Sequence, residues 1–569
     1  MQPRVSAMLL SLLRASAPRF PMYALLVVLT CRLVTLGSFP ILDPSEGRYA
    51  TISQNMVLTG DWITPLTFDE GTQVPFLGKP PLSFWLTALS FKAFGFTEFA
   101  ARLPSFIALL FLAAGLFHFC TTLFSRDVAF FSTIISMSSL VTFFFAGACM
   151  LDPWLATAIG GAVMALALSL RAPTPKESAA WGYLFFFSLA LGLLCKGPVA
   201  LVLTIVSIVP WLLIDHQYRK LSRLPWIRGL ALTTALSAPW YFLAEMYNPG
   251  FLRYFLINEN LLRFLVKEYG DRYGSGHQHV RGMIWLMLLG AFAPWTVLFS
   301  WMVWRSRPLA SVRATLFTPS AVLVASWGLA PCLFFTVGRQ VSIYYVLPGI
   351  PGLSIILALL LHKLWYTQPA RCAQYFFVQS YLTRVLSFAV VATMLLLNGD
   401  FFSASLSLLA LGFCEIIAYA TSSKLTRSSA TEDDKFLYFG TATLSLVVFY
   451  SVAQVMQVTA LGGNVSSKDV VRYLESLPEV SHVTFLGKIP QSSHLYARDG
   501  VNDHLSLFST NDTLGNWEGP LVMSARRWGK LPDGERALLE EVAEVPGWLV
   551  LAKKPATAAA GAIDSLPHH

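Results

Sequence analysis

The chain has 569 residues and a net charge of +9, and 55% of its residues are hydrophobic whereas only 13% are charged. A typical soluble domain carries about 25% charged residues, so the composition excludes an ordinary soluble protein and favours a membrane protein. The basic residues lie in short loops between apolar runs rather than in one patch, which argues against nucleic-acid binding.

Apolar runs long enough to cross a bilayer recur along the first 460 residues. A hydrocarbon layer about 30 Å thick requires about 20 apolar residues, and on this basis we predict about thirteen spans. They are 20–41, 100–124, 127–149, 152–170, 179–195, 198–214, 229–247, 281–304, 318–337, 342–361, 382–398, 401–421 and 436–459. The apolar run 81–95 is too short for a span, and we interpret it as interfacial or re-entrant.

Positive charge predicts the orientation of these spans. One predicted face receives most of the loop lysines and arginines, including Arg126, Arg171, Lys220 and Arg313. The positive-inside rule makes that face cytoplasmic. The long loops 42–99 and 248–280, and the tail, then lie outside; in a bacterium this corresponds to an inner-membrane protein with a periplasmic tail.

The first outer loop begins with charged residues at the predicted membrane boundary. They are Asp43, Glu46 and Arg48, and Tyr49 follows directly. We expect a short interfacial helix over 47–56, and Lys79 brings a cation back to the bilayer surface. A carboxylate there can take a proton from an acceptor hydroxyl, and a lysine can neutralise a phosphate. The alternative is that the two acids only cap the helix, whose N-terminus favours negative charge.

Other polar residues fall at the same predicted face. They are Asp152, Lys196, Glu259, Arg263, His277, His279, Arg339 and Tyr345. Acids at membrane depth are functional candidates by default, although Asp152 precedes a proline and so suits a helix start. As an alternative to a functional role, Lys196 can extend its ammonium to the membrane surface. Tyr345 can likewise be one of the tyrosines that are common at membrane interfaces. The His-x-His pair at 277–279 suits a metal only weakly by its spacing.

The tail differs from the rest of the chain because its hydropathy drops after residue 461. Short strand-like runs at 482–486 and 547–551 alternate with helical patterns at 467–477 and 535–545. This pattern predicts a small α/β domain over 461–569, outside the membrane, beside a transmembrane domain over 1–460. The seven cysteines all lie in or beside apolar runs without CxxC spacing, which indicates buried small residues rather than a zinc site.

Several short motifs occur together over residues 40–350. They are Pro44 to Ala50, Gly60-Asp61-Trp62-Ile63, Lys79-Pro80, Leu151-Asp152-Pro153, Lys196-Gly197, Glu259 with Arg263-Phe264, Pro294-Trp295 and Tyr345. In this order they resemble the GT-C membrane glycosyltransferases that use polyprenyl-phosphate sugars. Within that group the resemblance is to the bacterial aminoarabinose (lipid A) transferases, relatives of the protein O-mannosyltransferases. It implies a mainly α, GT-C-like fold of thirteen spans with a periplasmic α/β tail.

Three departures from the family pattern affect the site. Ser45 stands where the family has its first-loop aspartate, so we expect Asp43, or alternatively Glu46, to replace it. Gly78 and Asn260 stand where the aminoarabinose transferases carry a glutamate and a histidine linked to a metal. Their joint loss argues against that metal site. A divalent metal at His277 and His279 is the alternative, and we assign no metal ligand and no certain cofactor.

The resemblance and the residues together predict an inverting glycosyltransferase. Its donor would be an undecaprenyl-phosphate sugar, and its acceptor lipid A or another envelope glycan. We assign Asp43, Asp152 and Glu46 to catalysis. We assign Lys79, Lys196, Arg263, Tyr345, Arg48 and Arg339 to the donor phosphate and lipid, and Tyr49, Glu259, His277 and His279 to the sugar or acceptor. A flippase for a lipid-linked sugar and a catalytically silent relative are the alternatives, although we find no repeated halves of the kind that transporters show.

Overall fold

The structure is a computed structural model that describes residues 20–69, 71–266, 278–306, 318–367, 381, 385, 466–477, 482–497, 507–511 and 519–554. The chain forms two compact units. The first consists of residues 1–36, 77–83 and 102–453, and the second of residues 37–76, 84–101 and 454–569. The tail therefore shares a unit with most of the first predicted outer loop. The predicted domain boundary at residue 460 stays a prediction.

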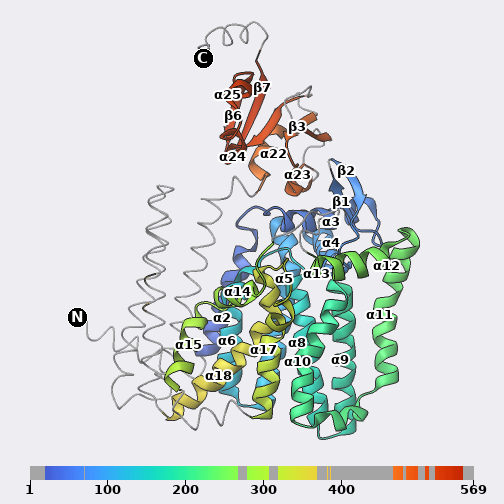
Figure 1. The fold of residues 1–569 in the computed structure, drawn as a ribbon, viewed down its shortest axis with the longest axis vertical. Helices are drawn as coiled ribbons and strands as arrows, with labels where there is room; N and C mark the ends of the chain where they lie inside the picture. The colour runs from blue at the N-terminus through green and yellow to red at the C-terminus, as the bar shows by residue number, and fades with distance from the viewer. Residues whose placement is uncertain are drawn as a thin grey trace, which may run out of the picture. The chain divides into compact units, whose positions relative to one another are not determined.

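The described part of the first unit is helical (Figure 1). Its elements are α2 (Phe20–Val34), η2 (Thr35–Gly37), α5 (Glu98–Leu123), α6 (Arg126–Ser138), α7 (Leu140–Phe145), α8 (Asp152–Arg171), α9 (Pro175–Lys196), α10 (Pro198–Ile214), η3 (Gln217–Arg223), α11 (Trp226–Tyr247), α12 (Phe251–Arg253), η4 (Tyr254–Leu262), α13 (Arg263–Leu265), α14 (Met283–Ala291), α15 (Trp295–Ser306), α17 (Pro319–Phe335), η5 (Ile343–Gly349) and α18 (Ile350–Thr367). Of these, η2 ends and α5 begins with residues of the second unit. Helices α8, α9 and α10 run side by side, and α17 packs on α10 and α18.

Four of the described helical segments are long and apolar enough to cross a membrane. They are Glu98–Leu123, Asp152–Arg171, Pro175–Lys196 and Ile343–Leu364. Two bent pairs, α10 with η3 and α14 with α15, would raise the number to six among the described residues. The chain is thus a multi-pass membrane protein by composition and helix length. The total of thirteen stays a prediction, since the expected spans 382–398, 401–421 and 436–459 lie almost wholly outside the described residues.

Two predicted spans are each broken into two helices. Within the predicted span 127–149, α6 ends at Ser138 and the short helix α7 follows from Leu140. The backbone N–H of Leu140 donates to the carbonyl of Ala293. The predicted span 281–304 bends by 105° between α14 and α15. Pro294 lies at this bend, and a proline cannot supply the N–H that a continuous helix needs there. The two breaks therefore meet through one backbone hydrogen bond.

The second unit contains most of the first outer loop. The predicted helix over 47–56 is α3 (Ser45–Thr59), which ends where Gly60 takes a left-handed conformation with φ of 74°. The hairpin of β1 (Leu66–Asp69) and β2 (Thr72–Pro75) was not predicted. The run 81–95 forms α4 (Leu82–Phe94), which at 13 residues is too short to span a bilayer. Its interfacial or re-entrant position stays a prediction.

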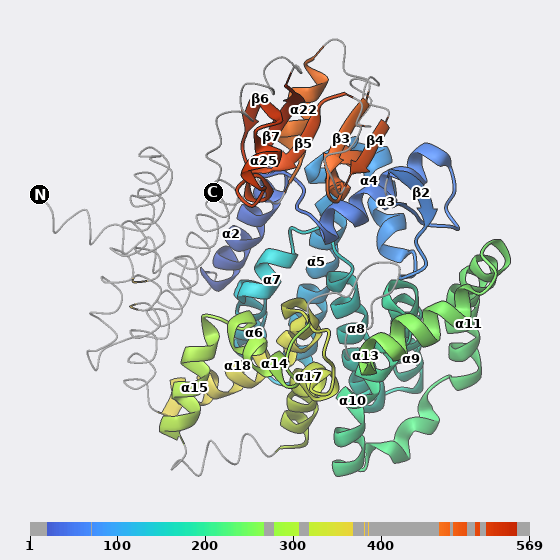
Figure 2. The same ribbon diagram turned by 45° about the horizontal axis from the view of Figure 1, so that its top comes forward.

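The described tail is a five-stranded sheet with short helices (Figure 2). Its elements are α22 (Lys468–Glu475), β3 (His482–Leu486), α23 (Gln491–Tyr496), β4 (Leu507–Asn511), β5 (Leu521–Ser524), α24 (Ala525–Trp528), α25 (Asp533–Arg536), β6 (Leu539–Val545) and β7 (Trp548–Lys553). The strand order is β4-β3-β5-β7-β6, with β3 parallel to β4 and β5 and the other pairs antiparallel.

One element of the tail was predicted wrongly. Residues 535–545 were expected to form a helix, but only α25 overlaps that range and residues 539–545 form the edge strand β6. Pairing with β7 satisfies the backbone of this segment and buries Leu539 and Val545 at its ends. Its glutamates remain exposed, as is common on an edge strand.

Candidate functional site

Lys79, Glu259 and Arg263 form an ion-paired cluster in the first unit. The ammonium of Lys79 donates to Glu259 Oε1, and Arg263 Nη1 donates to both oxygens of Glu259 at 2.9 Å. Arg263 Nε also donates to Gln340 Oε1 at 2.7 Å. One buried carboxylate therefore holds two cations from distant parts of the chain.

Glu259 lies on η4, a π-helix of nine residues. The side-chain amide of Asn260 donates to the carbonyl of Phe255, five residues back, at 2.7 Å, which supports the wider turn. The ring of Phe255 lies against Gly197, where a Cβ atom would approach it to 2.5 Å. This close approach packs η4 against the α9–α10 turn that follows Lys196. Segments of π-helix frequently occur at functional sites.

Asp152 and Lys196 form a second ion pair in the same unit. Lys196 Nζ lies 2.6 Å from Asp152 Oδ1. Asp152 is the first residue of α8, but no side chain caps that helix, so the partner of its carboxylate is the lysine at the end of α9. The ammonium also lies over the rings of Tyr345, at 4.6 Å, and Tyr344, at 5.6 Å. Such contacts stabilise a cation away from water.

The cations of the two pairs remain more accessible than the acids. The side chains of Lys79, Lys196 and Arg263 are 18%, 13% and 26% exposed, whereas Glu259 and Asp152 are 3% and 2% exposed. The pKa of Lys79 lies below its usual value because burial and the charges of Arg263 and Lys196 outweigh the attraction of Glu259. A site with three reachable cations and covered acids suits an anionic group such as a phosphate.

Asp43 and Glu46 lie in the second unit, just before and at the start of α3. Glu46 Oε2 accepts from the backbone N–H of Leu42 at 2.9 Å, a contact that closes the turn before α3, and no side chain caps the first turn of that helix. Asp43 Oδ1 accepts from the N–H of Ser492 at 3.0 Å, and Oδ2 accepts from the Ser492 hydroxyl. Burial raises the pKa of Asp43 to about 6, despite the hydrogen bonds from Ser492.

The remaining candidates are distributed over both units. Tyr49 on α3 packs its ring 5.6 Å from that of Phe84, and Arg48 precedes it on the same helix. The backbone N–H of His279 donates to the carbonyl of Arg339 at 2.8 Å. His277 lies outside the described residues. Within the described ranges, no group of three or more His, Cys, Asp or Glu side chains is placed to hold a metal.

Gln340 and Ser492 contact predicted site residues but were not predicted as part of the site. Nothing in the sequence marks Ser492, which lies 449 residues from its partner Asp43. Glu259 and Arg263 lie four residues apart in a helical segment, and this spacing is typical of an ion pair on one helix face. Their pairing could therefore have been predicted from the sequence.

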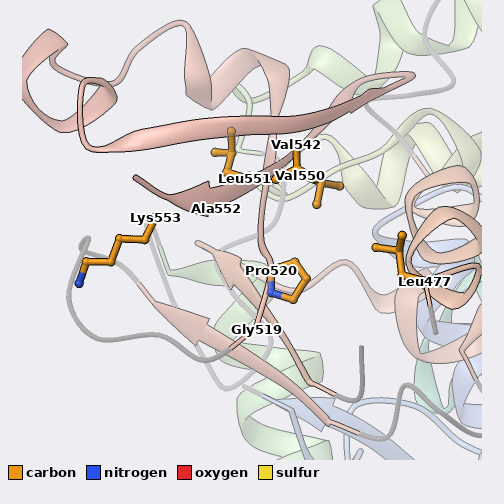
Figure 3. Close-up of a pocket in the computed structure, with 8 residues that line it drawn as sticks. All are labelled: Leu477, Gly519, Pro520, Val542, Val550, Leu551, Ala552 and Lys553. Atoms are coloured by element: carbon orange, nitrogen blue, oxygen red, sulfur yellow. The ribbon is translucent and has the colours of Figure 1, made fainter. Parts of the chain in front are cut away.

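The tail sheet has a cavity of about 280 Å³, and its lining includes no residue of the ion-paired clusters (Figure 3). Its lining is mostly apolar and comes from the end of α22, the approach to β5, and strands β6 and β7. None of the predicted site residues lines it.

Comparison with known proteins gives sequence and fold relatives. The profile of the dolichyl-phosphate-mannose-protein mannosyltransferase family matches residues 78–242. The undecaprenyl phosphate-alpha-4-amino-4-deoxy-L-arabinose arabinosyl transferase of Yersinia enterocolitica is 28% identical over 333 residues, which are 57% of this chain and 56% of the relative. That of Aeromonas salmonicida is also 28% identical, over 57% of each chain. The chain thus matches little more than half the length of these relatives.

The likeness in fold extends further along the chain. The crystal structure of ArnT from Cupriavidus metallidurans bound to undecaprenyl phosphate superposes with a TM-score of 0.74 at 18% sequence identity. The match covers 95% of this chain and 98% of ArnT. The chain therefore has the fold of ArnT and, by sequence and fold, resembles the polyprenyl-phosphate-dependent membrane glycosyltransferases of the GT-C superfamily.

Proposed function

We propose that the protein is an inverting glycosyltransferase that moves a sugar from undecaprenyl phosphate to an acceptor at the outer face of a bacterial inner membrane. The observation that carries this proposal is that three cations, Lys79, Arg263 and Lys196, are paired with buried acids but stay partly exposed to solvent. The ring of Tyr345 lies beneath the Lys196 ammonium. The names of the sequence relatives and the ligand in the ArnT structure support the same donor class.

In the proposed reaction the donor phosphate binds to the ammonium and guanidinium groups. Lys79 and Arg263 now bind Glu259, so the phosphate would compete with that carboxylate for them. An acceptor oxygen attacks the anomeric carbon, and the bond from that carbon to the phosphate oxygen breaks on the opposite face. The cations stabilise the negative charge that develops on the leaving phosphate.

A carboxylate takes the acceptor proton, or orients a phosphate acceptor. Asp43 suits proton transfer because its pKa of about 6 lies near neutral pH. Asp152 is the alternative, and its ion pair with Lys196 suits an orienting role. Lipid A or another envelope glycan is the proposed acceptor, and the tail is proposed to lie in the periplasm.

The test uses purified full-length protein in lipid nanodiscs with an undecaprenyl-phosphate sugar and lipid A. We expect release of undecaprenyl phosphate together with glycosylated lipid A, and loss of both products in Lys79→Ala. Release of neither product, by protein that still binds undecaprenyl phosphate, would contradict the proposal.

The competing function is a flippase for the same lipid. Reconstitution in vesicles separates the two functions, because a flippase moves the intact donor across the bilayer without releasing undecaprenyl phosphate. Transbilayer movement of intact donor without release would favour the flippase.

A further inference from the structure

The segment α23 of the tail binds the first-loop helix α3 through a series of hydrogen bonds within the second unit. Thr51 Oγ1 donates to the carbonyl of Gln491 at 2.9 Å, and Gln54 Nε2 donates to the carbonyl of Leu495 at 3.0 Å. The hydroxyl of Tyr496 accepts from the backbone N–H of Ile41 at 2.7 Å. The attachment of tail to loop therefore does not depend on any single side chain of α23.

Ser492 differs from these contacts because it reaches a carboxylate. Its amide and its hydroxyl donate to the two oxygens of Asp43. The hydroxyl also accepts from the backbone N–H of Ser467 at 3.1 Å and lies 2.7 Å from the Ser467 hydroxyl. A serine hydroxyl has one proton and two lone pairs. An ionised carboxylate only accepts, so the Ser492 hydroxyl gives its proton to Asp43. Its two lone pairs are then left for the N–H and the hydroxyl of Ser467.

We propose that Ser492 is a positioning residue for the Asp43 carboxylate, and that the tail thereby supplies part of the machinery for transfer. This inference rests on the proposed function with Asp43 as the base. Two donors from Ser492 on separate oxygens fix the plane of the carboxylate, and the backbone N–H of Gln491 is a third donor. Three donors leave one lone pair of the carboxylate for the acceptor proton. Ser492 and Ser467 are both fully buried, so water does not compete for these bonds.

The charged neighbours of Asp43 are few among the described residues. Glu46 is the charged group whose field acts on it, and this field favours the protonated form. From the tail, the facing groups of Gln491 and Ser492 are neutral, while Lys468 is paired with Glu98 and His494 stacks on Phe68. Donation from Ser492 therefore opposes both burial and Glu46 in keeping the carboxylate ionised.

The test compares the pH profiles of kcat/KM for wild type, Ser492→Ala and Ser493→Ala, using full-length protein and the donor-release assay. Ser493 is the matched control, since its buried hydroxyl has no hydrogen-bond partner in the described structure. A hydrogen bond to a charged group shifts the pKa of that group by about one to two units. We expect the acid limb of Ser492→Ala to move up by about that amount, with kcat partly recovered at high pH, and that of Ser493→Ala to stay in place.

An acid limb of Ser492→Ala that overlays wild type would overturn the inference, as would an equal loss of activity at every pH. If Ser492→Ala does not fold, Ser467→Ala decides, because it removes one partner of the Ser492 hydroxyl and should give a smaller shift in the same direction. An unshifted Ser467→Ala would then overturn the inference. Inactive wild-type protein would instead contradict the proposed function.

Discussion

Glu259 and Asp152, two buried acids in the described part of the first unit, are each balanced by a cation that remains partly exposed. Glu259 accepts from Lys79 and Arg263, and Asp152 from Lys196, so neither acid carries an uncompensated charge. The same arrangement keeps three cations in fixed positions before an anion arrives. Such preorganisation avoids the cost of assembling the charges at the moment of reaction.

Replacing Lys79 with alanine should lower turnover by roughly 100-fold, because a well-placed donor to a developing charge is worth about 3 kcal/mol. Donor-release kinetics measure this change. Lys92→Ala is the control, since that exposed lysine lies over the Trp62 ring and outside the cluster. Turnover of Lys79→Ala within a few-fold of wild type would remove Lys79 from the site.

Replacing Lys196 with methionine should destabilise the protein by about 3–5 kcal/mol, because Asp152 is left buried without its partner. Thermal unfolding in detergent measures the loss. The double variant Lys196→Met/Asp152→Leu should recover part of it, since no buried charge then remains. A double variant less stable than Lys196→Met would show that the unpaired carboxylate is not the cause.

The pH dependence of transfer should report Asp43. Its pKa of about 6 predicts that the rate falls below pH 6, by about tenfold per unit, as the base becomes protonated. Because this value lies above the unfolded value of about 3.9, the contribution of Asp43 to the free energy of unfolding decreases as pH rises from about 4 to 6. A flat rate profile from pH 5 to 7 would exclude Asp43 as the base and favour Asp152.

At the scale of elements, α3 carries Glu46 and follows directly on Asp43, and η4 carries Glu259. The start of α3 is closely packed, since a Cβ atom at Gly47 would lie 2.4 Å from Asp43 Oδ1 and 3.0 Å from the amide of Ser492. On η4 the wider π turn carries Glu259 to the cations that it binds. Both elements lie in segments that the sequence analysis placed in outer loops.

Gly47→Ala should lower transfer by about 100-fold, because a displacement of about 1 Å at a catalytic group has that effect. Gly290→Ala is the control, since a Cβ atom there meets no other atom within 4 Å. Initial rates and the amount of folded protein are compared for both variants. Full activity of Gly47→Ala would show that the position of Asp43 is not critical.

Local sequence patterns predicted α3, α22 and β3 correctly, because each of these elements can be recognised from its own residues. They could not predict β6, whose pairing with β7 overrides a helical pattern. They also missed the break after Ser138. There the N–H of Leu140 donates to the carbonyl of Ala293, which lies far along the chain between α14 and α15. The site was predicted residue by residue from charge and family pattern, whereas its pairings, such as Asp43 with Ser492, arise only from tertiary structure.

At the scale of the whole molecule, most of the first outer loop and the tail belong to one compact unit. We therefore predict that they lie on the same side of the membrane. In a variant without native cysteines, an impermeant maleimide should label exposed Thr72→Cys and Asp533→Cys from the same, outer side. Arg219→Cys, in η3, should react only from the other side. Labelling of Thr72→Cys and Asp533→Cys from opposite sides would contradict the predicted topology.

Mass spectrometry of membrane lipids tests the proposed transfer most directly, in a bacterium with and without this gene. We expect deletion to remove a sugar-sized mass from lipid A or another envelope glycan and to cause undecaprenyl-phosphate sugar to accumulate. Restoring the wild-type gene, but not the Lys79→Ala variant, should reverse both changes. Unchanged pools of donor and glycan, in cells that express the protein and make the donor, would contradict the proposed transfer.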